Sequence, residues 1–250
     1  MSSPLTFFLS ILLLHIAFAA NYCGTSFGDA RKCQTSCPRG LDGECPGSER
    51  CFASVTCSST PTTAPGPATG FAADIVSTTN AEYNTYGNLH ECFSPTMARR
   101  VGDYWDELGL NLDGCDRNVP WSAAFISYMV REAGGGTNFR YSSAHRDYIH
   151  DAFAGGRGLY NSVSNIDSST VRTGDLACSG RGRIGSWDYS DFLTWYNNGG
   201  TSHDTIPTHC DIVVAVSGST ITVIGGNVSQ RVTRNTVSKT TYAVLLPVTR

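Results

Sequence analysis

Residues 211–224 read DIVVAVSGSTITVI, and this stretch decides the fold class. Two runs rich in β-branched residues flank Ser217 and Gly218, which predicts a β-hairpin with its turn at these two residues. Further strands are expected at 176–178 and 241–248. No helical pattern alternates with these strands, so they predict an antiparallel sheet rather than a parallel one.

Helical patterns precede the strands. Residues 94–109 begin with Ser-Pro, keep apolar residues at helical spacing and end at a glycine. Residues 118–136 show a similar pattern and end in three glycines, and in residues 142–152 one helix face would carry His145 and Tyr148. Helices that come before an antiparallel sheet predict an α+β domain.

The N-terminal segment indicates the compartment. Residues 5–19 are apolar, contain no Asp, Glu, Lys or Arg, and end in Ala-Phe-Ala, which is typical of a secretory signal peptide and its cleavage site. The run is shorter than the ~20 residues that a membrane span needs. We therefore expect residues 1–19 to be a signal peptide, the protein to be secreted and extracellular, and its ten cysteines to form disulfides.

The composition excludes several partners. A net charge of −3, from 18 basic and 21 acidic residues, leaves no electrostatic basis for nucleic-acid binding. No later segment is apolar enough to span a membrane. His90-Glu91 and His203-Asp204 lack the ligand spacing of metal sites, so we expect no metal and no cofactor. The chain is expected to act as a monomer.

The spacing of the cysteines divides the mature chain. Six of the ten cysteines fall within residues 20–57, residues 58–70 are a Ser/Thr/Pro-rich linker, and residues 71–250 form the larger domain. A module this small needs disulfides to fold, and the sequence does not choose among their pairings. Its aromatic residues either pack on the disulfides or bind sugar rings, and they are Tyr22, Phe27 and Phe52. Together with the linker, this module resembles the chitin- or glucan-binding modules of secreted fungal and oomycete enzymes.

Three signatures follow one another in residues 71–250. WSAAFISY at 121–128 places Ser122 in the first turn of a helix, TGDLAC at 173–178 is a turn that leads into a strand, and His209 begins the next strand. This order resembles the papain-like hydrolases of the NlpC and CHAP type, which cut peptidoglycan. Residues 120–148 resemble more closely an uncharacterised-domain family placed near that superfamily. The resemblance implies a papain-like fold.

The resemblance also implies a site. Where those hydrolases have cysteine, this chain has Ser122, whose hydroxyl would need His209 as a general base. Asn227 would orient the His209 ring, and Asp211, two residues further along the strand, could supply a stabilising charge. Two alternatives stay open: Ser122 fills the first turn of a helix, and Asn227 carries a glycan, since it begins the sequon Asn-Val-Ser.

Other side chains near these motifs are candidate substrate contacts. Residues 179–208 are expected to be a loop, whose aromatic and arginine side chains either line a groove for glycans and acidic peptide stems or form a small core. His145 is either a hydrogen-bonded core histidine or a substrate-side acid. The candidate contacts in this domain are Trp121, His145, Arg181 and Trp187.

The resemblance further implies two disulfides. In the resembled fold the strands that carry Cys178 and Cys210 pair antiparallel, which brings these two residues within bonding distance and leaves Cys92 to bond Cys115. The competing possibility is that Cys210 is a free nucleophile beside His209.

We expect a secreted hydrolase of bacterial cell-wall peptidoglycan, of the amidase or endopeptidase type, whose partner is the insoluble wall polymer. A muramidase is the alternative, with two of Glu91, Asp116 and Asp211 as its acid/base pair. A non-catalytic wall-binding protein is the third possibility.

Overall fold

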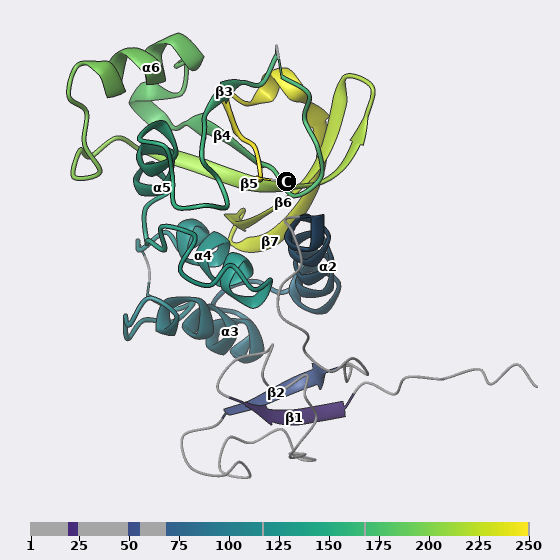
Figure 1. Ribbon diagram of the computed structural model, residues 1–250. Helices are drawn as coiled ribbons and strands as arrows, with labels where there is room; N and C mark the ends of the chain where they lie inside the picture. The colour runs from purple at the N-terminus through teal and green to yellow at the C-terminus, as the bar shows by residue number, and fades with distance from the viewer. Residues whose placement is uncertain (1–19, 25–49, 56–68, 117, 168, 250) are drawn as a thin grey trace, which may run out of the picture. The chain divides into compact units, whose positions relative to one another are not determined.

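The chain divides into two compact units, Met1–Thr62 and Thr63–Arg250. The structure is a computed structural model that describes residues 20–24, 50–55, 69–116, 118–167 and 169–249 (Figure 1).

The first unit contains one antiparallel pair of strands in its described part. β1 (Ala20–Gly24) pairs with β2 (Arg50–Val55), and the register places Tyr22 opposite Phe52. The expected signal peptide, Phe27 and residues 58–68 of the expected linker lie outside the described residues. The carbohydrate-binding role of this unit therefore stays a prediction.

The second unit begins with four helices and continues with a six-stranded antiparallel sheet. The helices are α2 (Thr69–Tyr86), α3 (Pro95–Asp106), α4 (Ser122–Glu132) and α5 (His145–Phe153). The strand order across the sheet is β3-β8-β4-β5-β6-β7 (Figure 1). The strands are β3 (Ser164–Asn165), β4 (Leu176–Gly180), β5 (Thr208–Ser217), β6 (Thr220–Val228), β7 (Arg231–Ser238) and β8 (Val244–Leu246). This arrangement confirms the α+β class with helices before an antiparallel sheet.

Local sequence explains where the predicted helices lie. Ser94 is the N-cap of α3, where its Oγ accepts a hydrogen bond from the Met97 N–H at 3.3 Å, and Pro95 occupies the first turn. The residues that α5 buries are those predicted to share one face, and they are His145, Tyr148, Ile149 and Ala152.

The sheet separates two apolar clusters. The larger cluster joins the helices to one face of the sheet, which Cys178, Cys210 and Ile212 share. The smaller cluster covers the other face, where Val213 and Val223 meet the Tyr242 ring and neighbouring apolar side chains. Because side chains alternate along a strand, His209 and Asp211 lie on the same side of β5 as Val213.

Several elements differ from the sequence prediction. The helix α2 begins at Thr69, inside the expected linker, and β3 and β7 carry polar sequences that lack a strand-like apolar run. Residues 179–208, expected to be a loop, contain the 3-10 helix η2 (Gly182–Ile184) and the helix α6 (Tyr189–Asn197). The α6 helix forms because Asp188 and Asp191 make a reciprocal capping box at its start. The last strand is only β8, preceded by the 3-10 helix η3 (Lys239–Thr241).

Both disulfides predicted for this unit are confirmed. Cys178 and Cys210 are cross-strand neighbours on β4 and β5 and are bonded, with their Cα atoms 4.1 Å apart. Cys92 is bonded to Cys115. Cys210 is therefore not a free nucleophile.

In the described ranges, no helix combines the length and the apolar character that crossing a bilayer requires.

Candidate active site

Ser122 lies where two helix starts meet. It is the first residue of α4, and its Oγ is 2.7 Å from Nε2 of His145, the first residue of α5. No side chain caps α4, because Trp121 occupies the N-cap position without making a cap hydrogen bond. The sequence predicted His209 as the imidazole partner of Ser122, and the structure places His145 there instead.

The hydrogen bonds of His145 assign its tautomer. Its Nδ1 accepts a hydrogen bond from the backbone N–H of Cys210 at 3.2 Å and also contacts the Tyr148 hydroxyl. A backbone N–H can only donate, so Nδ1 carries no proton and the neutral ring carries its hydrogen on Nε2. We therefore assign Nε2–H as the donor and Ser122 Oγ as the acceptor in this contact.

His145 is held in its neutral form. Its side chain is only 4% exposed. Burial, together with the charges of His209 and Arg181, holds the pKa of His145 well below its ordinary value of 6.5. The interpretation of His145 as a hydrogen-bonded, buried histidine matches this geometry.

His209 and Asp211 form an imidazole–carboxylate pair on β5. Nε2 of His209 lies 2.9 Å from Oδ1 of Asp211, and Oδ2 of Asp211 accepts a hydrogen bond from the Tyr242 hydroxyl at 2.6 Å. Burial alone would raise the pKa of Asp211, but His209, the Tyr242 hydroxyl and Arg181 together hold this pKa below its ordinary value. Asp211 is thus the charged partner of His209, a role that the sequence had suggested for it.

The two histidines are adjacent because β5 positions both. Their ring centroids are 5.1 Å apart. Cys210, between His209 and Asp211 on the strand, donates its N–H to His145 and is bonded through its side chain to β4. One strand therefore holds the imidazole–carboxylate pair and fixes the orientation of the second imidazole.

Two adjacent glycines on β6 allow this packing. A Cβ at Gly225 would overlap Oδ1 of Asp211, and a Cβ at Gly226 would lie 2.7 Å from the Trp121 ring. Neither position has room for a side chain. The glycines let Asp211 pack on one face of β6 and the start of α4 on the other.

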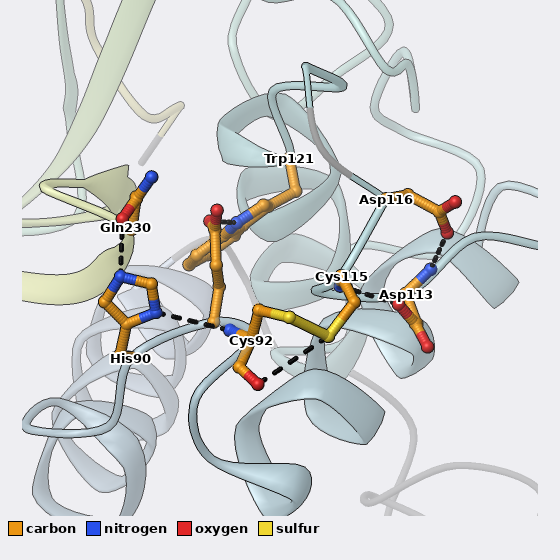
Figure 2. The surroundings of a disulfide bond; sticks show 8 residues. His90, Cys92, Asp113, Cys115, Asp116, Trp121 and Gln230 are labelled. Atoms are coloured by element: carbon orange, nitrogen blue, oxygen red, sulfur yellow. Dashed lines mark hydrogen bonds between the residues drawn. A yellow bond between two sulfur atoms is a disulfide. The ribbon is translucent and has the colours of Figure 1, made fainter.

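Asn227 holds the start of α4 rather than the His209 ring. In the amide orientation that satisfies both of its ends, Asn227 donates to Oε2 of Glu91 at 3.3 Å and accepts from the Trp121 backbone N–H at 3.2 Å. Nε1 of Trp121 also donates to Oε2 of Glu91, at 2.6 Å, beside the Cys92–Cys115 disulfide (Figure 2). Both ends of the Asn227 amide are therefore engaged, so a glycan at this residue would break these contacts.

The remaining candidate contacts separate into buried and surface residues. Trp121 is buried against Tyr104 and Phe125, so its ring belongs to the core and not to a substrate-binding surface. Arg181 is exposed and close enough to the Asp211 carboxylate to affect its pKa. Trp187 is partly buried at the start of α6.

The three acidic residues considered for a glycosidase have separate partners. Glu91 binds Trp121 and Asn227, Asp116 accepts the Asp113 N–H, and Asp211 binds His209. Within the described residues no hydrogen bond or ion pair joins two of them. The described ranges also contain no group of three or more His, Cys, Asp or Glu side chains that could hold a metal.

Because His145 is buried in its neutral form, we expect the free energy of unfolding to depend on pH. The unfolded chain takes up a proton at this residue as the pH falls below about 6.5, whereas the folded protein does not, so the free energy of unfolding decreases there by up to about 1.4 kcal/mol per pH unit. Asp211, with its lowered pKa, adds a further loss only below its ordinary pKa of 3.8. Urea unfolding at pH 7, 6 and 5 measures the effect.

The control for this prediction is His145→Gln, which cannot take up the proton. Between pH 6.5 and 5, its free energy of unfolding should decrease less steeply than that of the wild type, and the difference in slope should reach about 1.4 kcal/mol per pH unit. Equal slopes in the two proteins would contradict the neutral, buried state of His145.

The fold and the site define an α+β protein with a serine hydroxyl that contacts a buried histidine at a helix start, near a second imidazole that is paired with a carboxylate. The chain belongs to a family described as uncharacterised proteins conserved in bacteria (DUF2272), which matches residues 94–247. The match extends from the N-cap of α3 to the residue after β8 and includes Ser122, His145, His209 and Asp211. No curated protein and no solved structure matches the chain.

Proposed function

We propose that the chain is a secreted hydrolase of bacterial cell-wall peptidoglycan that cleaves amide bonds, as an amidase or endopeptidase. The observation that carries this proposal is the contact of Ser122 Oγ with an imidazole at an uncapped helix start, beside a buried His–Asp pair. The order of these elements resembles that of the papain-like NlpC and CHAP hydrolases, which supports peptidoglycan as the substrate. The two disulfides support an oxidising compartment.

In the proposed mechanism, His209 is the general base. Its Nε2–H donates to Asp211, which leaves the lone pair of Nδ1 to take the Ser122 proton. His145 lies between the two groups, since it contacts Ser122 Oγ and its ring centroid is 5.1 Å from that of His209, so the proton is proposed to pass through an intervening water. The Asp211 carboxylate then stabilises the imidazolium that forms. A carboxylate suits this task better than the Asn227 amide could, because serine has to lose its proton during the attack itself.

The other groups stabilise negative charge. Nε2–H of His145 donates to Ser122 Oγ and so orients this oxygen for attack on the carbonyl carbon. The first N–H groups of α4 have no side-chain cap, and they can donate to the carbonyl oxygen as it becomes negative. After attack, the imidazolium of His209 returns its proton to the leaving amine, and water completes the hydrolysis.

Digestion of purified, insoluble peptidoglycan tests this function. We expect new free amino groups to appear, and their identification shows which amide is cut. New reducing ends without amino groups would contradict the proposal and indicate a muramidase. Binding to the wall with neither product would indicate a non-catalytic wall-binding protein.

A further inference from the structure

A polar hollow lies over the face of the sheet that carries His209 and Asp211. β4, the turn before α6, and η3 contribute its walls, which include Ser179, Trp187 and Tyr242. Ser179 is the cross-strand neighbour of His209, and neighbouring side chains of this kind lie on the same face. Tyr242 donates its hydroxyl to Asp211. The hollow therefore borders the proposed acid–base pair.

A second hollow runs along α6. Its walls include Trp187, Trp195 and Asn198. Trp187 lines both hollows, so one ring lies at the point where they meet. This ring is fixed by an edge-to-face contact with the fully buried Phe192, at a centroid distance of 5.3 Å, while part of it stays exposed.

The lining chemistry indicates the kind of ligand. Each hollow is lined by two carboxylates, Asp167 and Asp188 in the first and Asp191 and Asp204 in the second, and no Lys, Arg or His among the described residues lines either. Negative walls repel an acidic peptide or a phosphate, whereas carboxylates and amides accept hydrogen bonds from sugar hydroxyls. A fixed aromatic ring offers its electron-rich face to the C–H groups of a pyranose.

We propose that the two hollows form one groove that binds a chain of N-acetylhexosamine residues, with Trp187 between two sugar-binding positions. The choice of this polymer rests on the proposed function, since peptidoglycan contains such a chain. Arg181, expected from the sequence to contact acidic peptide stems, lines neither hollow. In this proposal the glycan strand binds in the groove, beside the residues proposed to cleave the amide bond.

Calorimetric titration of the full chain with N-acetylglucosamine oligomers tests the groove. We expect saturable binding that is tighter for the tetramer than for the dimer, because only the longer oligomer can occupy both hollows. Trp187→Ala should raise the Kd for the tetramer by about tenfold, and Trp187→Phe, which keeps an aromatic face, should retain most of the affinity.

Two further variants complete the test. Phe93 is 79% exposed and lines neither hollow, so Phe93→Ala is the matched aromatic control and should leave the Kd unchanged. Asp167 is exposed and lines the first hollow, and Asp167→Ala should weaken binding without affecting folding. Circular dichroism checks that each variant is folded.

Several outcomes would contradict the proposed glycan-binding groove. They are the absence of saturable binding to the wild type, an unchanged Kd in both Trp187→Ala and Asp167→Ala, and binding of a stem peptide in place of the oligomer. This experiment measures binding without turnover, so it can fail independently of the hydrolase proposal. A wild type that binds the tetramer but releases no amino groups from peptidoglycan would contradict only the hydrolase proposal.

Discussion

Ser122→Ala should lower amide hydrolysis of peptidoglycan by at least about 10³-fold while the protein stays folded. The substitution removes the oxygen that forms the new bond to the carbonyl carbon. It also removes the acceptor of the buried His145 Nε2–H, a loss that should cost about 1–3 kcal/mol of unfolding free energy. Release of free amino groups measures activity, and thermal unfolding measures stability.

The matched control is Ser127→Ala. Ser127 is a second buried serine on α4, and its Oγ makes two hydrogen bonds to the backbone of Ser142. This variant loses comparable contacts but should keep its activity. Ser122→Cys should retain activity and become sensitive to thiol reagents, because a helix start and nearby imidazoles favour a thiolate. Full activity in Ser122→Ala would rule out Ser122 as the nucleophile.

The second large effect concerns stability. Glu82→Ala should lower the free energy of unfolding by about 3 kcal/mol, because it removes the buried carboxylate that binds Arg100 twice and leaves the guanidinium only the more exposed Asp103, at 3.1 Å. Arg100 is 4% exposed and makes two hydrogen bonds of 2.7 Å to Glu82, which also accepts from the Tyr104 hydroxyl. Burial acts to lower the pKa of Arg100, but Glu82 outweighs it and holds this pKa well above its ordinary value. Urea unfolding measures the change.

A less buried pair of the same residue types is the control. Arg131 and Glu107 also form an ion pair, but Arg131 is 37% exposed to water. Glu107→Ala should therefore cost no more than about 1 kcal/mol. If the two substitutions had equal effects, burial of the Glu82–Arg100 pair would not be the reason for its contribution.

The sequence predicted the elements whose signals are local. The apolar face of α5 and the hairpin of β5 and β6 follow from residue spacing and turn chemistry alone. The helix α2 was missed because two of the side chains that it buries are polar, Thr79 and Glu82. Glu82 is buried only because Arg100, on another helix, pairs with it, and a local pattern assigns a glutamate to the surface.

The site was predicted in part for a similar reason. The association of His209 with Asp211 follows from their alternation on one strand, which the sequence shows directly. The contact of Ser122 with His145 depends on the N–H of Cys210, a third segment that only the folded chain brings near. Spacing placed His145 on a buried helix face but carried no signal of its hydrogen-bond partners.

At the glycine pair on β6, side chains from both faces of the sheet pack directly on the strand backbone. Elsewhere a layer of side chains separates the strand backbone from whatever packs on it, but at Gly225 and Gly226 the backbone itself meets Asp211 on one face and Trp121 on the other. A single peptide layer thus separates the Asp211 carboxylate from the Trp121 ring at the start of α4. The negative charge of Asp211 and the positive end of the α4 dipole therefore act on each other across the strand with little intervening material to weaken their field.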